Sequence, residues 1–169
     1  MSHAVPKKAS VEESIVLAVL DLSNQLGKLG EGLAGRADLT TQQWLVLLQV
    51  AGDPNFHSPD GRPARTKGGV LGSEIALARG VSRASVSTLV AQLLAKGLVK
   101  RQAEASDRRR KGLSVTAKGR AALARLEASR RHANRVLLAD LGAPERAALL
   151  RSLRACLRCA AASTSVSGG

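Results

Sequence analysis

Short hydrogen-bonding side chains are concentrated in residues 80–96, GVSRASVSTLVAQLLAK. On a helix, the apolar members of this stretch form one stripe: Val86, Leu89, Val90, Leu93 and Leu94. Small or polar residues fill the opposite side, and they are Ala84, Ser85, Ser87, Thr88, Ala91 and Gln92. Because such side chains let a helix backbone approach base edges in the DNA major groove, the pattern predicts a groove-reading helix. The alternative is an ordinary amphipathic helix with a small polar face.

Basic residues dominate the segment 100–111, which follows this helix. Six are basic, against the acidic Glu104 and Asp107: Lys100, Arg101, Arg108, Arg109, Arg110 and Lys111. The flanking runs 98–101 and 113–116 have the alternation of strands, so the segment reads as a charged hairpin. A hairpin tip this positive suits a phosphate backbone or a narrow minor groove. A solvated charged turn is the alternative.

The other reactive side chains form no recognisable catalytic pattern. Cys156 and Cys159 stand three apart and fit either buried thiols at a helix interface or a redox pair. His57 and Asp60 are too few ligands for a metal site. There is no Gly-rich phosphate loop, no G-x-S-x-G elbow and no H-E-x-x-H motif. We therefore expect no metal, no cofactor and no enzyme activity.

Two terminal regions carry the stripes of helices that pack along other helices. In the first region the spacings are 4, 3, 4, 3 and 4, through Ile15, Val19, Leu22, Leu26, Leu29 and Leu33. Glycines at 27, 30, 32 and 35 predict that firm helix ends near Leu29. At the other end a helix is expected from 117 to about 141, and Pro144 opens the last helix. Both regions are expected to form a dimer interface.

Between these regions lie the elements that must position the groove-reading helix. Thr40 and Gln43 form a capping box that starts a helix containing Trp44. Residues 52–69 hold three of the five prolines and read as an extended loop. Residues 73–79 are expected to form the first helix of a helix-turn-helix, with Gly80 in the turn.

The order of these segments resembles the MarR family of bacterial transcriptional regulators. VSRASVSTLVAQLLAKGLVKR followed by SDRRRKGLSVTAKGR is similar to the family's recognition helix, wing and Asp-x-Arg signature, here Asp107 and Arg109. LTTQQWLVLL at 39–48 is similar to the helix that precedes the DNA-binding motif. The resemblance covers residues 10–160. There are two departures: Thr88 stands where many members carry Arg, and the 52–69 loop is longer than usual.

This resemblance implies a mainly α fold with a small β-wing, a winged helix-turn-helix that forms a homodimer through its N- and C-terminal helices. The expected divisions are a disordered lead (1–10), an N-terminal dimerisation helix (11–38), the DNA-binding lobe (39–116), C-terminal dimerisation helices (117–163) and a tail (164–169). Within the lobe, 98–116 would be the wing. The family also implies an effector pocket between the dimer helices and the DNA-binding lobe, with Trp44 and Leu48 as lining candidates. A core position is the alternative for Trp44.

The expected activity is repression from a pseudo-palindromic operator in double-stranded DNA, relieved by a small lipophilic or aromatic acid. The candidates for base contacts are Arg83, Ser85, Ser87, Thr88 and Gln92. The candidates for wing contacts are Arg108, Arg109 and Arg110, with Asp107 holding Arg109 or a neighbour in place through an ion pair.

Composition agrees with a DNA partner. The 169 residues suit one domain, and 26 lysines and arginines against 13 acidic residues give a formal charge of +13. No apolar run reaches the ~18 residues of a membrane-spanning helix, and the start shows no signal peptide, so a cytoplasmic protein without a membrane partner is expected. Two alternatives stay open: a non-specific architectural DNA-binding protein, and a redox switch through Cys156 and Cys159 on the same fold.

Overall fold

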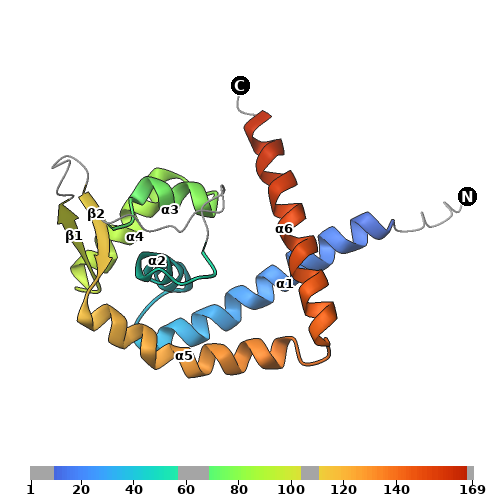
Figure 1. The fold of residues 1–169 in the computed structure, drawn as a ribbon, viewed down its shortest axis with the longest axis horizontal. Coiled ribbons are helices and arrows are strands. Elements are labelled where there is room, and N and C mark those ends of the chain that lie inside the picture. The colour runs from blue at the N-terminus through green and yellow to red at the C-terminus, as the bar shows by residue number, and fades with distance from the viewer. Residues whose placement is uncertain (1–9, 57–68, 104–110, 167–169) are drawn as a thin grey trace, which may run out of the picture.

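The structure is a computed structural model that describes residues 10–56, 69–103 and 111–166. In chain order its elements are α1 (Val11–Ala34), the 3-10 helix η1 (Gly35–Ala37), α2 (Thr41–Ala51), α3 (Gly72–Arg79), α4 (Arg83–Ala95), β1 (Val99–Ala103), β2 (Lys111–Val115), α5 (Ala117–Leu137) and α6 (Ala143–Val166). Figure 1 shows α2, α3, α4 and the two strands gathered in one lobe, while α6 stands apart from it. This is the mainly α fold with a small β-wing that the sequence predicts.

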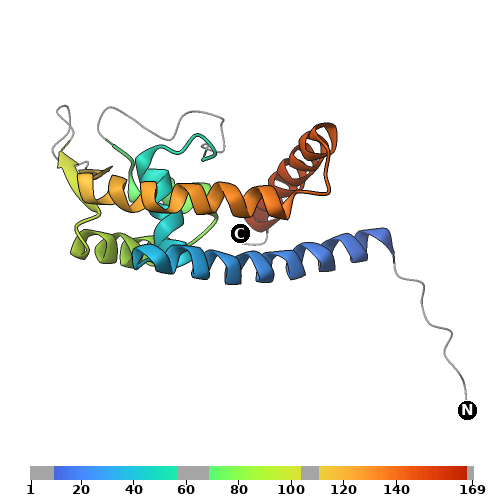
Figure 2. The same ribbon diagram turned by 90° about the horizontal axis from the view of Figure 1, so that it is seen from below.

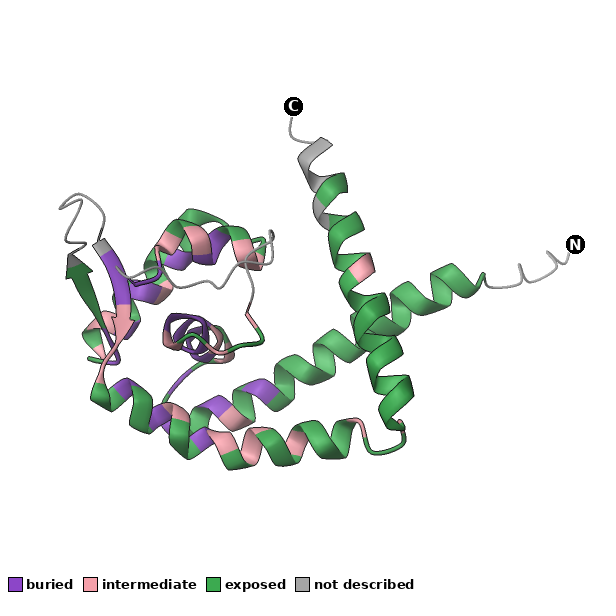
Figure 3. Ribbon diagram, viewed as in Figure 1, coloured by how far each residue is buried: buried purple, intermediate pink, exposed green. Residues whose placement is uncertain are grey.

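The hydrophobic core lies where α2 passes through the middle of the lobe. Val46 and Leu47 of α2, Ile75 of α3 and Leu93 of α4 are completely buried. Figure 3 shows buried positions concentrated on α2 and on the sides of its neighbours that face it. The first half of α5 joins this core through Ala122 and Leu126, which are also buried. Helix α4 is therefore held against α2 along its apolar side.

Two glycines with a left-handed backbone conformation lie after the two helices of the helix-turn-helix. Gly80 has φ +61° directly after α3, and Gly97 has φ +68° just beyond α4. Residues with a Cβ rarely adopt this conformation, so glycine is suited to both reversals. Ser82 caps α4, because its side chain accepts a hydrogen bond from the Ser85 backbone N–H. Helix α4 thus begins directly after Ser82, within the 80–96 stretch that the sequence predicts to be helical.

The wing is a two-stranded antiparallel sheet in which Val99 pairs with Val115 and Arg101 with Leu113. Val70 forms an isolated bridge with Leu113. Thr116 then caps α5 and donates its hydroxyl hydrogen to the Gly97 carbonyl at 2.7 Å. The wing, the end of α4 and the start of α5 are thus tied together.

Helix α1 continues to Ala34, so the prediction that firm helix ends near Leu29 is wrong. The helix begins with a complete capping box between Ser10 and Glu13. Gly30 is buried against α2, and the close approach of the two helices requires a residue without a side chain there. Packing against the lobe thus outweighs the low helix propensity of glycine.

An ion-pair cluster links the end of α2 to α5. Arg130 Nη1 lies 2.8 Å from Asp53 Oδ2, and its Nη2 lies 2.7 Å from Glu127 Oε2. Asp53 also accepts hydrogen bonds from the backbone and side-chain nitrogens of Asn55. Burial opposes ionisation of Asp53, but these bonds and Arg130 outweigh it, so the pKa of Asp53 lies below its ordinary value.

The two terminal helices expose most of their surface. Residues 11–29 of α1 are exposed throughout, and the described side chains of α6 are exposed except for half-buried Ala155. Figure 2 shows α1 and α5 running side by side away from the wing. Among the described residues, no helix is long and apolar enough to span a membrane.

Candidate nucleic-acid interface

Helix α4 turns its short polar side chains outward. Val86, Val90 and Leu93 are buried on the core side, and Leu89 and Leu94 are half-buried. All five candidates for base contacts are exposed: Arg83, Ser85, Ser87, Thr88 and Gln92. The structure therefore gathers them on one element, and α4 offers little bulk to keep a DNA groove at a distance.

Internal hydrogen bonds limit the hydrogen bonds that the hydroxyl groups on this face can still donate to a partner. Thr88 Oγ1 lies 3.2 Å from the Ala84 carbonyl oxygen, to which it donates its only hydroxyl hydrogen. Its lone pairs and its methyl group are what remain for a partner. Ser85 shares its hydroxyl with Ser82 at an Oγ–Oγ distance of 2.8 Å, next to the helix cap. Each side chain is thus partly oriented before any DNA arrives.

The side chain of Gln92 is held by a hydrogen bond from α2. Gln43 Nε2 donates to Gln92 Oε1 at 2.8 Å, and Gln43 is itself buried. Gln43 is the capping residue that the sequence predicts, but its contact with Gln92 was not predicted. Nothing in residue spacing signals a bond between side chains 49 positions apart.

The C-terminal end of α4 is bonded to the residue that follows η1 and to α5. Lys96 Nζ donates to Asp38 Oδ2 at 2.7 Å and also bonds the Asp38 carbonyl oxygen. The hydrogen bond from Lys96 and the charge of that ammonium lower the pKa of the Asp38 carboxyl. Lys118 of α5 donates to the Lys96 carbonyl oxygen at 2.8 Å. Lys96 and Lys118 thus connect the end of α4 to the end of η1 and to α5.

The wing contributes positive charge beside α4. Lys100 and Arg101 of β1 are both exposed. The predicted wing residues Asp107, Arg108, Arg109 and Arg110 lie outside the described residues, so their roles stay predictions. The described part of the wing alone adds two cations that suit phosphate contacts.

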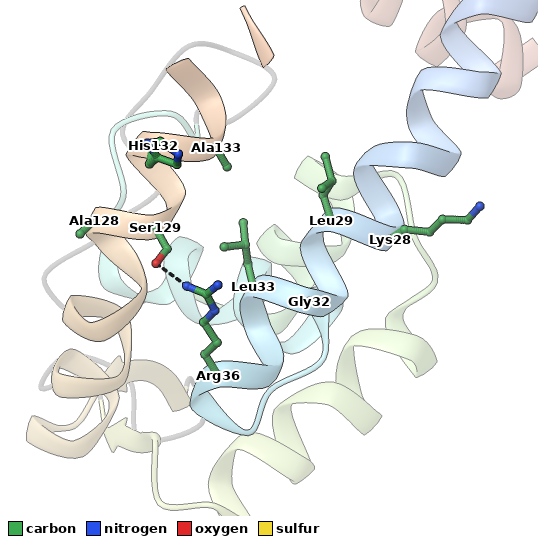
Figure 4. Close-up of a pocket in the computed structure, with 9 residues that line it drawn as sticks. All are labelled: Lys28, Leu29, Gly32, Leu33, Arg36, Ala128, Ser129, His132 and Ala133. Carbon is green, nitrogen blue, oxygen red and sulfur yellow. Dashed lines mark hydrogen bonds between the residues drawn. The ribbon is translucent and has the colours of Figure 1, made fainter. Parts of the chain in front are cut away.

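A cavity of about 590 Å³ opens between α1 and α5. Figure 4 shows Arg36 reaching across it to Ser129, whose Oγ accepts its hydrogen bond at 2.8 Å. The lining combines aliphatic surface with basic side chains: Lys28, Leu29, Gly32, Leu33, Arg36, Ala128, Ser129, His132 and Ala133. Such a lining suits a small apolar molecule that carries a negative charge.

The two predicted effector-pocket residues lie elsewhere. Trp44 and Leu48 are both 7% exposed and belong to the core around α2. Neither is among the described residues that line the α1–α5 cavity. Trp44 therefore has a packing role in this structure, and its part in ligand binding stays a prediction.

Both cysteines lie on α6, and both are exposed. They are accessible to oxidants and are not packed inside the chain to which they belong. Among the residues that the structure describes, no three His, Cys, Asp or Glu side chains come together to hold a metal ion.

Comparison with known proteins supports the winged-helix assignment. Residues 63–110 match the family model described as MarR family. The transcriptional regulator SlyA shares 21% identity and a TM-score of 0.73, covering 88% of this chain and 95% of its own. A MarR protein from Peptoclostridium difficile has 15% identity, a TM-score of 0.74 and 96% coverage of both chains.

Another similar structure is a Staphylococcus aureus MepR–DNA complex. It shares 18% identity and a TM-score of 0.69, covering 89% of this chain and 96% of its own. No curated protein matches the chain in sequence. The family model and the fold together confirm the resemblance seen in the sequence: the chain has the winged-helix fold of the MarR-family regulators, and its segment 63–110 matches that family in sequence.

Proposed function

We propose that the protein is a sequence-specific transcriptional regulator that binds double-stranded DNA as a homodimer. The observation that carries this proposal is the exposed face of α4, where Ser85, Ser87, Thr88 and Gln92 project from a helix anchored by its apolar side. Base edges are read by side chains of this kind, whereas Lys100 and Arg101 on the neighbouring strand suit the phosphate backbone.

Binding to a pseudo-palindromic operator requires a second copy of the chain, related to the first by a two-fold axis. Large apolar side chains are exposed on α1 and α6, among them Leu20, Leu22, Leu150 and Leu157. The two helices also differ in charge: α1 carries Glu12, Glu13, Asp21 and Glu31 against Lys28, while α6 carries Arg146, Arg151, Arg154 and Arg158 against Glu145. Packing between copies would cover the apolar surface and set two α4 helices about one DNA turn apart, as a pseudo-palindrome requires.

Regulation is proposed to act through the cavity between α1 and α5. A small lipophilic or aromatic acid would place its carboxylate near Arg36 and its apolar part against Leu29 and Leu33. Because Lys96 joins α4 to Asp38 at the end of η1, a ligand that spreads α1 from α5 would change the separation of the α4 helices. The protein would then act as a repressor that the ligand releases from its operator.

The binding experiment uses fragmented genomic DNA at physiological salt with excess competitor DNA. Sequencing of the retained fragments is expected to show one enriched inverted repeat. Uniform retention would contradict the proposal and would favour the second candidate, a non-specific architectural protein, for which a formal charge of +13 suffices. Footprinting on the enriched repeat would then show whether two half-sites are protected.

The effector proposal is tested with a panel of substituted benzoic acids and their neutral amides. Acids are expected to weaken operator binding by wild-type protein, whereas Arg36→Gln should lose this response and keep its DNA affinity without ligand. Arg125→Gln is the matched control, because Arg125 is an exposed arginine of α5 that is not among the residues lining the cavity. Equal responses in the wild-type and Arg36→Gln proteins would refute this site.

A further inference from the structure

We infer that Gln43 fixes the orientation of the Gln92 amide, so that Gln92 turns its Nε2 hydrogens rather than its oxygen toward DNA and selects guanine at one position of each half-site. This inference rests on the proposed function, because it concerns base reading by the same helix. Gln43 does not reach DNA in this scheme. It is a positioning residue that acts through Gln92.

The direction of the Gln43 amide follows from a backbone group. The Thr40 N–H donates to Gln43 Oε1 at 3.1 Å, and the Gln43 N–H donates to Thr40 Oγ1 at 3.2 Å. A backbone N–H is only a donor, so the side-chain atom that meets it must be the oxygen. The Gln43 side chain is therefore not free to exchange its two ends, and burial keeps it in place because only 6% of the residue is exposed.

The direction of the Gln92 amide follows from that of Gln43. With its oxygen engaged by Thr40, Gln43 turns its Nε2 toward Gln92, at 2.8 Å from Oε1. An amide nitrogen only donates, so the atom of Gln92 that it meets must be the oxygen. The relay from Thr40 through Gln43 thus leaves the two Nε2 hydrogens of Gln92 as the end available to DNA.

Gln92 is placed where such a contact is useful. It is exposed, and it follows Ser85 by seven residues, which puts both on one side of α4 with Thr88 near them. A side chain on this helix face that is already oriented loses less conformational freedom on binding than a mobile glutamine would.

Base chemistry then determines the preference. In the usual glutamine–adenine pair, the amide oxygen accepts from adenine N6 while the nitrogen donates to N7. Here that oxygen is directed toward Gln43, which engages one of its two lone pairs, so it is turned away from the base that Nε2 meets. Guanine presents two adjacent acceptors, N7 and O6, whereas adenine sets an amino group beside N7 that would face the Gln92 hydrogens. We expect guanine to be favoured over adenine by about 5- to 150-fold, as for other good base contacts.

Three variants test whether the hydrogen bonds from Thr40 through Gln43 to Gln92 determine the base preference. Gln43→Glu keeps the capping box, since glutamate serves there as well as glutamine. Its second oxygen would have to meet Gln92 Nε2, so the Gln92 amide would turn and present its oxygen to DNA. Gln42→Glu adds the same charge one residue away, on a side chain that bonds Arg79 instead. Gln92→Ala removes the side chain that is proposed to contact the base.

The experiment selects bound duplexes from a random-sequence library with each protein and records its thermal unfolding. Wild-type and Gln42→Glu proteins are expected to share one guanine position per half-site. Gln92→Ala should lose the preference at that position alone. Gln43→Glu should shift it toward adenine or cytosine, which present amino donors.

A second measurement needs no change in the core of the protein. In the selected operator, 7-deazaguanine removes the N7 acceptor at the guanine position, whereas hypoxanthine keeps both N7 and O6. The deaza base should weaken binding of wild-type protein and leave that of Gln92→Ala unchanged, and hypoxanthine should be tolerated by both. This measurement tests whether Gln92 donates a hydrogen bond to the guanine, even if the Gln43→Glu protein unfolds.

The outcomes distinguish this inference from the proposed function. A wild-type protein that enriches no sequence refutes sequence-specific reading altogether. Clear enrichment with a Gln92→Ala profile identical to wild type, or uniformly weaker on all sequences, refutes only the base contact of Gln92. A folded Gln43→Glu protein that still selects guanine refutes the orienting role of Gln43.

Discussion

At Gly30, α1 comes so close to the start of α2 that a Cβ atom would lie 2.7 Å from Thr41 Oγ1 and 2.8 Å from Thr41 Cγ2. Both branches of the threonine side chain point at that position, so no simple rotation would make room. Gly27, one turn earlier on the same helix, has open space where its Cβ would be. Packing therefore requires a glycine at position 30 but not at position 27.

We predict opposite stability changes for alanine at these two glycines. Gly27→Ala should raise the free energy of unfolding by about 0.5 to 1 kcal/mol, because alanine favours helix more than glycine does. Gly30→Ala should lower it by about 1 to 2 kcal/mol, because the overpacking outweighs the same gain in helix propensity. Urea denaturation followed by Trp44 fluorescence measures both, since this is the only tryptophan in the chain.

Removal of the obstructing side chain provides the control. In a Thr41→Ala background, Gly30→Ala should become neutral or stabilising, since the atoms it would strike are absent. A Gly30→Ala protein as stable as Gly27→Ala in the wild-type background would show that α1 and α2 are not in close contact.

Between elements, the cluster of Asp53, Arg130 and Glu127 joins the end of α2 to the middle of α5. The Asp53 side chain is 7% exposed and that of Arg130 is 22% exposed, so solvent screens this pair less than a surface pair. Arg131 also bonds Glu127 at 2.6 Å, but its side chain is 69% exposed. The two neighbouring arginines thus make similar contacts at very different depths.

We predict that Arg130→Met lowers the free energy of unfolding by about 1.5 to 3 kcal/mol near neutral pH, because a nearly buried carboxylate loses its charged partner. The pKa of Asp53 is depressed in the folded protein, so its contribution is present above the unfolded pKa of about 4 and is lost as pH falls through the lower folded value. The difference between wild type and Arg130→Met should therefore shrink below about pH 4.

Arg131→Met is the matched control for this pH series. An exposed pair spaced i,i+4 contributes only about 0.3 to 0.5 kcal/mol, so this variant should stay close to wild type at neutral pH. Urea titrations of the three proteins at a series of pH values test the comparison. A constant difference between wild type and Arg130→Met down to strongly acid pH would exclude Asp53 as the group responsible.

The elements were largely predictable from sequence because their signals are local. The Thr40–Gln43 box, Ser82 before α4 and the alternation on either side of the charged hairpin all act within a few residues. The length of α1 was not predictable, since it depends on how Gly30 packs against α2. The Gln43–Gln92 bond and the α1–α5 cavity were missed for the same reason: each joins residues that are distant in the chain and whose types alone specify no partner.

Across the whole molecule, apolar surface is distributed unevenly. Among the described residues, the lobe around α2 buries most of its large aliphatic side chains, whereas α1 and α6 leave Ile15, Leu22 and Leu157 in contact with solvent. Many large apolar side chains exposed along the same helices often mark a protein interface. The distribution favours a dimer in which the terminal helices of two chains cover each other.

We predict that Leu22→Glu combined with Leu153→Glu converts the protein to a monomer, because each interface would otherwise have to bury four unpaired carboxylates. Sedimentation equilibrium measures the mass, and the far-ultraviolet circular dichroism of the lobe should be retained. Leu77→Glu is the control, since Leu77 is 71% exposed on α3, away from the terminal helices, and should leave the mass unchanged.

The same double variant links assembly to DNA recognition. A monomer presents one α4 helix and loses the advantage of engaging two half-sites at once, so its affinity for an inverted repeat should fall by about 100-fold or more. Its affinity for a single half-site should stay near that of wild type, because the face of α4 is untouched. A double variant that remains dimeric would place the interface on another surface. One that becomes monomeric and still binds the repeat at full strength would show that a single lobe suffices for recognition.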